Sequence, residues 1–234
     1  MEIAISLVVA YLLGSLPTAY LAGRLTRGVD IRKLGSGSVG GSNVATVVSR
    51  WLVFPVGIVD VGKGMLAVAL AKWLDVDLAW QVAAGLLAVA GHNWSIFLGF
   101  SGGRGIGTGM GVMFVLLPLA LPVLVAVFLA VLLIANVPLA FLACFTALPF
   151  ISWGMGKPTA VTLGFMGVFL ILVAKRLLGN KGKAESSEGW HRILLYRLFL
   201  DRDVRDKNDW IRRQLTQTDL AEPQDNQEIG RKAT

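Results

Sequence analysis

Charged residues are scarce in this sequence. Asp, Glu, Lys and Arg make up 16% of its 234 residues and hydrophobic residues make up 55%, whereas an average soluble domain is about 25% charged. The single cysteine, Cys144, excludes an internal disulfide. No Cys or His residues have metal-ligand spacing, and neither H-E-x-x-H nor G-x-S-x-G occurs. The sequence therefore predicts neither a metal site nor an enzyme built on a nucleophile and a base.

The few charges are unevenly distributed. Residues 1–174 hold 9 Lys or Arg and 5 Asp or Glu, and the last 60 residues hold 13 and 10. The net charge of +7 would suggest nucleic acid as the partner of a soluble protein. Here the cations lie in loops and in the tail, where anionic lipid headgroups are within reach. We expect membrane lipids, and no nucleic acid, as the polyanionic partner.

Long apolar runs are present in place of charge, and each is long enough for a helix that crosses a bilayer. The fourth run contains Pro118 and Pro122, which break the hydrogen-bond ladder of a helix, so we expect a short helix followed by a full one. The number of helices is then six or seven. The runs cover residues 3–22, 51–73, 78–98, 108–134, 136–155 and 158–178.

Positive charge predicts the orientation of these helices. The segment before the first run carries Glu2 and no basic residue, whereas residues 24–50 carry five, which places the N-terminus outside. Residues 74–77 then lie outside, and Arg104 lies inside. The basic start of the tail must also be cytoplasmic, which requires an odd number of crossings. We therefore expect an all-α integral membrane protein with about seven transmembrane helices, its N-terminus outside and its C-terminus cytoplasmic.

The chain divides into three parts. We expect residues 1–180 to form a polytopic membrane domain. In residues 181–214, aromatic and aliphatic side chains interleave with six arginines, which predicts a basic amphipathic helix in the headgroup plane; a solvated tail with incidental aromatics is the alternative. Residues 215–234 are polar, and we expect them to be disordered.

Two glycine-rich loops follow apolar runs, namely Gly35-Ser-Gly-Ser-Val-Gly-Gly-Ser-Asn43 and Phe100-Ser-Gly-Gly-Arg-Gly-Ile-Gly-Thr-Gly109. A glycine backbone can approach a phosphate closely, and Arg104 adds a permanent cation, so the two loops predict an anion-binding site. The first loop also matches G-x-G-x-x-G, but it lacks the βαβ unit that a dinucleotide fingerprint requires. Ordinary turn glycines remain the other interpretation.

Polar residues also occur inside the apolar runs. Asp60 and Lys63 lie three residues apart on one helical face, where a structural ion pair and a substrate contact are both open. His92 and Asn93 close the third run, just before the Arg104 loop. His92 is a candidate general acid or base, or a residue that bonds a backbone carbonyl at the helix end.

The order and spacing of these motifs resemble the bacterial acyl-phosphate:glycerol-3-phosphate acyltransferases of the PlsY type. The resemblance runs from residue 5 to about residue 180, which makes the expected membrane domain of residues 1–180 acyltransferase-like. It is carried by Gly14-Ser-Leu-Pro17, Asp30-Ile-Arg32, Gly35-Ser-Gly37, Gly40, Asn43, Asp60-x-x-Lys63-Gly64, Gly91-His92-x-x-x-x-Phe97-x-x-Phe100 and Gly102-Gly103-x-Gly105-x-x-Thr108.

The resemblance implies a seven-helix enzyme of the cell membrane with its active site at the cytoplasmic face. In that family an acyl group passes from acyl phosphate to the 1-hydroxyl of glycerol 3-phosphate, which gives lysophosphatidic acid for phospholipid synthesis without a cofactor. The chemistry is substrate-assisted, so the protein positions and neutralises two anions and supplies no catalytic residue. The implied substrate-binding residues are Ser36, Gly37, Ser38, Gly40, Asn43, Lys63, His92, Gly102, Gly103, Arg104, Gly105 and Thr108.

The sequence departs from the family pattern in both loops. The family's first motif reads G-S-G-N-x-G-A-T-N with an arginine three residues on, and this chain has Ser38 for the first asparagine, Gly41-Ser42 for Ala-Thr and Thr46 for the arginine. In the second loop, K-G-G-K-G has become Ser101-Gly-Gly-Arg104-Gly.

Two later motifs are also reduced, to Asn136-Val-Pro-Leu-Ala-Phe141 and to Ala174-Lys-Arg-Leu-Leu-Gly179. Because these losses fall on groups expected to hold glycerol 3-phosphate, we expect the protein to bind this acceptor more weakly than the acyl donor. Candidate cations that could replace the missing ones are Arg32, Arg50 and Lys175. The alternatives are a family-derived membrane protein with an altered acceptor or no catalysis, acting as a regulatory or lipid-binding paralogue, and a transporter or another small membrane protein.

Overall fold

The structure, a computed structural model, describes residues 1–179, 189–202 and 205, and the regular elements within them are helices joined by loops. Short 3-10 turns at Arg50–Leu52, Ile96–Leu98 and Pro118–Ala120 connect some of the helices. The α-helices are α1 (Glu2–Ser15), α2 (Thr18–Arg27), α3 (Gly41–Val47), α4 (Val53–Trp73), α5 (Leu78–Asn93), α6 (Ile106–Leu116), α7 (Leu121–Ile134), α8 (Val137–Gly154), α9 (Thr159–Leu178) and α10 (Trp190–Leu200).

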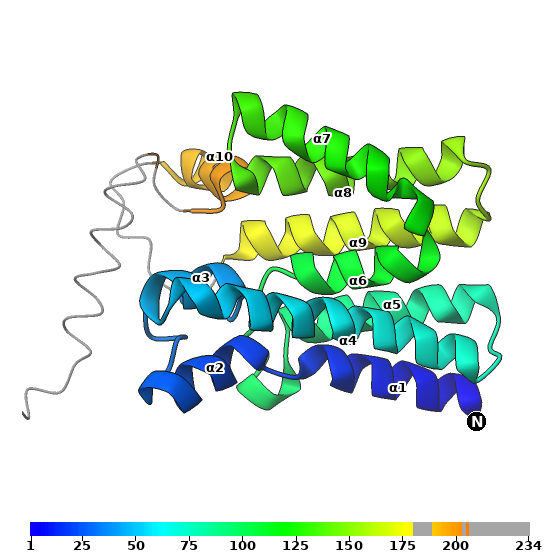
Figure 1. Cartoon of the computed structure of the whole chain (residues 1–234), viewed down its shortest axis with the longest axis horizontal. Coiled ribbons are helices and arrows are strands. Elements are labelled where there is room, and N and C mark those ends of the chain that lie inside the picture. Colours follow the sequence, from blue (N-terminus) through cyan, green and yellow to red (C-terminus); the bar gives the residue numbers. More distant parts are fainter. Residues whose placement is uncertain (180–188, 203–204, 206–234) are drawn as a thin grey trace, which may run out of the picture.

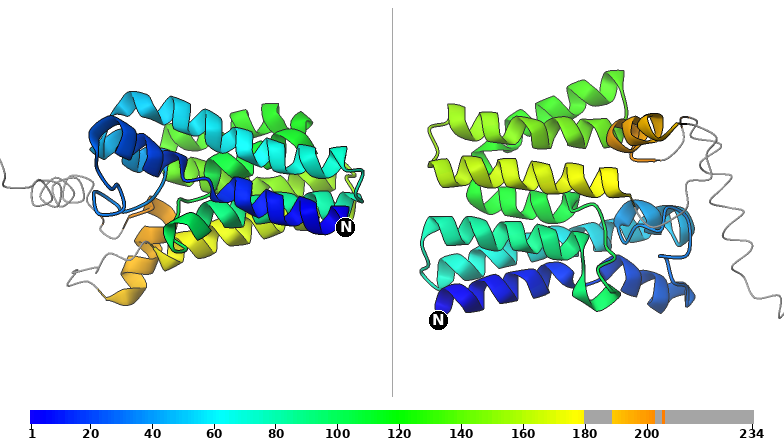
Figure 2. Two further views of the ribbon diagram at one scale, coloured as in Figure 1. Left: turned by 90° about the horizontal axis from the view of Figure 1, so that it is seen from below. Right: turned by 180° about the vertical axis from the view of Figure 1, so that it is seen from behind.

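The long helices run alternately between the two ends of the molecule, as Figures 1 and 2 show. The N-terminus lies at one end, and α2, α3 and α10 lie at the other. Residues 24–50, the Arg104 loop and the end of α9 therefore meet at one end: Val39 N–H donates to Gly102 O, and Arg104 donates to Lys175 O. This arrangement agrees with the predicted grouping of the cationic loops, as far as residue 179.

Small residues allow the helices to pack closely. A side chain at Gly14 would collide with the backbone of Ala88 where α1 crosses α5, and one at Gly111 would collide with the backbone of Val61 where α6 crosses α4. Membrane helices associate through such close backbone contact because burial of apolar surface gives little drive in lipid. Further along the bundle, α5, α6, α8 and α9 enclose an apolar core that includes Val89, Val112, Phe145, Phe165 and Val168.

Many large apolar side chains on the helices face outward, among them Leu133 at 88% and Trp73 at 79% exposure. Exposure on this scale would be costly in water and is expected against hydrocarbon. Among the described residues, the segments Glu2–Arg27, Arg50–Trp73, α8 and α9 are each long and apolar enough to cross a membrane, and α6 with α7 adds a bent pair. Seven crossings and an outside N-terminus stay predictions.

Prolines divide two of the predicted apolar runs. The run at residues 3–22 is two helices, because the chain leaves α1 at Leu16 and Pro17 before it enters α2. The fourth run is divided as expected: α6 ends at Leu116, the turn at Pro118 follows, and the chain bends by 112° between α6 and the segment Pro118–Ile134. Proline lacks the N–H that a continuous helix would need at these positions.

The described part of the predicted 181–214 segment contains the helix α10, which packs against α8 and α9. Its buried residues include Ile193 and Arg197. Whether this helix also lies in the headgroup plane stays a prediction. Residues 180–188, 203–204 and 206–234 are outside the described residues, and with them the predicted disorder of 215–234.

Candidate functional site

A polar cavity of about 130 Å³ opens at the end of the bundle where α3 and α6 begin. Both glycine-rich loops border it, although the first ends 57 positions before the second begins. The first turn of a helix such as α6 presents N–H groups without intrahelical acceptors, which favours an anion. The lining residues are Ser36, Ser38, Gly40, Gly41, Ser42, Asn43, Asp60, His92, Arg104, Gly105, Ile106, Gly107 and Asp201.

Asn43 organises the first loop. Its Oδ1 accepts the Ser36 N–H at 3.1 Å, and its Nδ2 donates to Ile31 O at 2.9 Å and to Leu34 O at 3.1 Å. The side chain is 3% exposed, and its amide is engaged with the backbone of residues 31–36. Asn43 therefore shapes the loop that borders the cavity, rather than presenting a free amide to it.

The second loop is pressed against the first and against the end of α5. Gly103 N–H donates to His92 O at 3.0 Å, and a side chain at Gly103 would collide with the His92 ring and with Val39 O. Gly105 has φ of +76° where the loop enters α6, a conformation that glycine adopts readily and most other residues avoid. Glycine is needed here for contact between the loops and for the turn.

Asp60, which lines the cavity, contacts three side chains. Its Oδ1 accepts the Thr18 hydroxyl at 2.6 Å and lies 2.9 Å from Lys63 Nζ and 3.6 Å from His92 Nδ1. Lys63 Nζ also donates to Leu16 O at 3.2 Å. Lys63 is 3% exposed, so in this structure it belongs to a buried ion pair with Asp60. Of the two residues, Asp60 alone lines the cavity.

Arg104 is the permanent cation among the described residues that line the cavity. Its Nη1 donates to Lys175 O at 3.1 Å, and its Nε lies 2.9 Å from Asp201 Oδ1. The guanidinium is thus held at the mouth between the end of α9 and the residue that follows α10.

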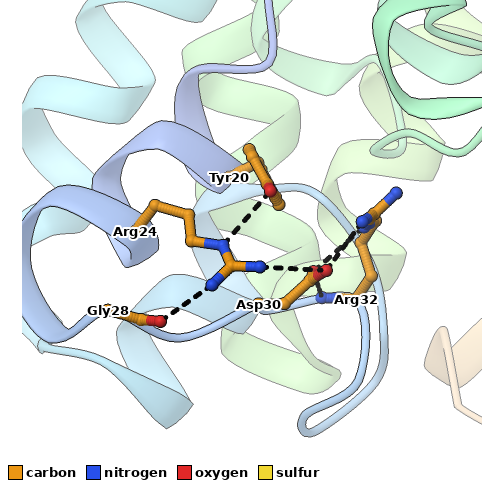
Figure 3. Close-up of polar contacts among 5 residues, drawn as sticks. All are labelled: Tyr20, Arg24, Gly28, Asp30 and Arg32. Atoms are coloured by element: carbon orange, nitrogen blue, oxygen red, sulfur yellow. Dashed lines mark hydrogen bonds and ion pairs between the residues drawn. The ribbon is translucent and has the colours of Figure 1, made fainter.

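The cations proposed as replacements do not line this cavity. Arg32 makes an ion pair with Asp30 at 2.6 Å, and Arg24 donates to the Tyr20 hydroxyl and to Gly28 O, as Figure 3 shows. The hydrogen bond and charge of Arg32 hold the pKa of the Asp30 carboxyl below its ordinary value.

The other two candidates are engaged with aromatic rings. The Arg50 guanidinium lies 5.6 Å from the centre of the Trp51 ring, and Lys175 Nζ lies 5.5 Å from the centre of the Trp94 ring. At these distances both cations make cation–π contacts.

The predicted site residues fall into two groups. Seven of them line the cavity, namely Ser36, Ser38, Gly40, Asn43, His92, Arg104 and Gly105. Gly37, with φ of +66°, turns the first loop; Gly102 and Gly103 pack against His92; Lys63 pairs with Asp60; Thr108 is fully buried on α6 against Gly64. In this structure these five shape and support the cavity without lining it.

Sequence reasoning did not place several lining residues at the site. Gly41, Ser42, Ile106 and Gly107 adjoin predicted positions and follow from the helix starts. Asp201 is different, because it lies 97 positions beyond Arg104 in a tail treated as a separate segment. No motif in a single sequence signals that contact.

A second, apolar cavity of about 260 Å³ lies between α6, α7 and α8. Met110 and Met113 line it, about one and two helical turns beyond the α6 residues that border the polar cavity. The remaining lining side chains are Leu121, Leu124, Val125, Phe128, Leu129, Phe141, Cys144, Phe145 and Leu148. One helix thus borders a polar and an apolar cavity in succession.

A known protein family matches the membrane domain over nearly its whole length. The family model described as glycerol-3-phosphate acyltransferase matches residues 4–180, which is most of the chain and includes both loops. The chain belongs to the glycerol-3-phosphate acyltransferase family. This finding confirms the resemblance found in the sequence and places the chain among integral membrane acyltransferases.

Individual members of the glycerol-3-phosphate acyltransferase family are similar to this chain over half or more of their own length. Glycerol-3-phosphate acyltransferase 4 of Dehalococcoides mccartyi (strain CBDB1) is 40% identical over 209 residues, which cover 87% of this chain and 90% of that protein. A family member from Prochlorococcus marinus (strain MIT 9313) is 50% identical over 102 residues, 44% of this chain and 50% of that protein.

The crystal structure of PlsY (YgiH), an integral membrane glycerol 3-phosphate acyltransferase, in its glycerol 3-phosphate form is also similar. Its TM-score is 0.73 at 27% identity, covering 89% of this chain and 97% of that one. The lysophosphatidic acid form gives a TM-score of 0.71 at 26% identity, covering 90% and 98%.

Proposed function

We propose that this protein transfers a fatty acyl group from acyl phosphate to the 1-hydroxyl of glycerol 3-phosphate, at the cytoplasmic face of the cell membrane. The products are lysophosphatidic acid and inorganic phosphate. The observation that carries the proposal is the polar cavity, in which Arg104, the start of α6 and two glycine-rich loops surround one small space. Similarity to proteins described as glycerol-3-phosphate acyltransferases, one of them crystallised in a glycerol 3-phosphate form, supports the choice of acceptor.

The proposed reaction needs position and charge more than side-chain chemistry. The acceptor hydroxyl oxygen forms an ester bond with the acyl carbon, the bond from that carbon to the phosphate oxygen breaks, and the departing phosphate takes the hydroxyl proton. Two anions repel each other in the cavity, so a cation and helix N–H groups lower the barrier by offsetting that repulsion. Holding the hydroxyl beside the acyl carbon supplies a further part of the rate.

The acyl chain is proposed to lie in the apolar cavity of α6, α7 and α8. That cavity borders α6 just beyond its phosphate-binding turn, so a chain whose phosphate sits in the polar cavity can follow the helix into the bilayer. The cavity lining carries no charged residue among the positions named above, as a fatty chain requires.

The test is an assay of the purified protein in detergent with acyl phosphate and glycerol 3-phosphate. Release of phosphate together with formation of lysophosphatidic acid is the expected result, and a parallel reaction with acyl coenzyme A identifies the donor. Phosphate release without the lipid product indicates an altered acceptor. The absence of both reactions, from protein that binds glycerol 3-phosphate, favours the non-catalytic paralogue.

A further inference from the structure

The helix α10 lies beyond the family match, which ends at residue 180, yet it is firmly anchored to the membrane domain. Arg176 on α9 donates to Leu198 O at 2.8 Å, and Arg197 on α10 donates to Leu177 O at 3.0 Å. Each helix thus supplies an arginine to a carbonyl of the other. Both arginines are buried, at 2% and 6% exposure, so the contact is part of the protein's interior.

This anchoring delivers one carboxylate to the polar cavity. Asp201 directly follows α10 and has φ of +55°, a left-handed conformation that aspartate tolerates better than most residues. Its Oδ1 reaches 2.9 Å from Arg104 Nε, and both residues line the cavity. The tail therefore places a negative charge where the proposed substrates must bring theirs.

The contact between Asp201 and Arg104 is an ion pair that can be exchanged. The two atoms are close, but among the described residues neither atom makes a hydrogen bond with suitable geometry, so the pair lacks the directional part of a charge-assisted bond. The Asp201 side chain is 23% exposed and Arg104 15%. Water is therefore available to the carboxylate when it leaves the guanidinium.

We propose that Asp201 sets the affinity of the cavity for anionic substrates, by occupying Arg104 until a substrate phosphate displaces it. The inference rests on the proposed function, because it takes Arg104 as a ligand of that phosphate. A phosphate brings more negative charge than a carboxylate and can accept two parallel N–H groups from one guanidinium. The phosphate can therefore replace Asp201 at Arg104. Because the ion pair with Asp201 must first be broken, it lowers the affinity of the cavity for the phosphate.

The exchange requires movement of one side chain only. The anchors of α10, at Leu198 O and Leu177 O, do not involve Asp201, and Arg104 keeps a second bond to Lys175 O. The guanidinium thus stays at the mouth of the cavity while its partner changes. Substrate release restores the internal pair.

The test compares binding of glycerol 3-phosphate, and separately of inorganic phosphate, to the full chain and to Asp201→Asn by calorimetry in detergent. Asparagine keeps the left-handed backbone and the shape but removes the charge. We expect the dissociation constant to fall about 2- to 5-fold in the variant, the upper part of the range for a partly exposed ion pair. Asp201→Gly, which also suits the backbone, is a second variant in case the first does not fold.

Two controls make the result specific. Asp77→Asn removes an equal charge from an exposed position at the far end of the bundle and should leave the constant unchanged. In an Arg104→Ala background, Asp201→Asn should change the constant less than twofold, because the residue it competes for is gone. An unchanged or weaker affinity in Asp201→Asn, with Arg104 intact, would overturn the inference.

Failure of this inference and failure of the proposed function can be told apart. Tighter binding in Asp201→Asn without any acyl transfer by the wild type would support the exchange and reject the reaction. Acyl transfer by the wild type with equal binding in the two proteins would support the reaction and reject the exchange.

Discussion

Among single residues, Arg104 has the most direct bearing on the cavity, because the chain places no other permanent cation in the described lining. Arg104→Ala removes a charge that offsets the repulsion between two phosphates. We expect a loss of about 2 to 4 kcal/mol of transition-state stabilisation, or roughly 30-fold to 1,000-fold in kcat/KM. Full activity in a folded alanine variant would mean that Arg104 only sets the topology.

Thr46 stands where the family pattern has an arginine, and the structure explains how an arginine there would act. The Thr46 hydroxyl donates to Ser42 O one turn back along α3, and Ser42 lines the cavity. Side chains on a helix lean toward its N-terminus, so an arginine at position 46 would point its charge toward the acceptor.

We therefore predict that Thr46→Arg lowers the KM for glycerol 3-phosphate by roughly 10-fold or more, since a charge-assisted hydrogen bond contributes about 1.5 to 3 kcal/mol. The dependence of the rate on acyl phosphate should stay nearly unchanged. Thr26→Arg is the matched control, because Thr26 is an exposed threonine with the same bond to the fourth residue back and lies on α2 at the same end of the bundle. A wild-type KM already in the micromolar range would contradict the idea of a weak acceptor side.

At the scale of helices, Asp60 joins three elements. It receives the Thr18 hydroxyl from α2 and pairs with Lys63 on its own helix, beside His92 on α5. Asp60→Asn would leave the Lys63 charge buried without its partner, which typically costs about 3 to 5 kcal/mol.

The detergent-solubilised Asp60→Asn variant should therefore unfold at a much lower temperature than the wild type. The double variant Asp60→Asn with Lys63→Met should recover most of that loss, because it removes both buried charges. Equal stability of the single variant and the wild type would show that the pair contributes nothing to the folded state.

The helices α6, α7 and α8 enclose the proposed site of the acyl chain, and α7 offers a matched pair of positions. Val125 and Val123 are both 47% exposed, but only Val125 lines the apolar cavity. Val125→Trp should fill the cavity and shift the preference toward shorter acyl phosphates by several-fold in kcat/KM. Val123→Trp should leave the preference unchanged; the same shift in both variants would place the chain elsewhere.

At the scale of the whole molecule, the clustering of cationic loops predicts a sidedness. In a Cys144→Ala background, single cysteines at positions 104 and 181 should be labelled from the same side of the membrane, and one at position 77 from the opposite side. Labelling of positions 104 and 181 from opposite sides would rule out the odd number of crossings.

The hydrophobic runs and their breaks could be predicted from the sequence because both depend on local properties. Length and hydropathy located α4, α8 and α9, and the missing N–H of Pro118 marked the separation of α6 from α7. The break at Pro17 was not predicted, since the apolar run continues across it.

The candidate site was predictable where the two loops carry their own signal, as at Ser36 and Arg104. It was not predictable where folding decides the role of a residue. The Asn43 amide is hydrogen-bonded to the backbone of its own loop, Lys63 is ion-paired with Asp60, and Arg32 is ion-paired with Asp30. Asp201 reaches the cavity only because α10 folds back onto α9.

The buried Arg176 has a consequence for the order in which the protein is made. Its guanidinium is satisfied by Pro138 O, synthesised earlier, and by Leu198 O, synthesised 22 residues later. While the ribosome is still adding residues 177–197, the nitrogen that donates to Pro138 O has its partner and the nitrogen that donates to Leu198 O does not. The last contact of Arg176 therefore forms only after residue 198 has been translated, and a chain that stops between residues 176 and 198 would leave one donor group of this buried cation without its acceptor.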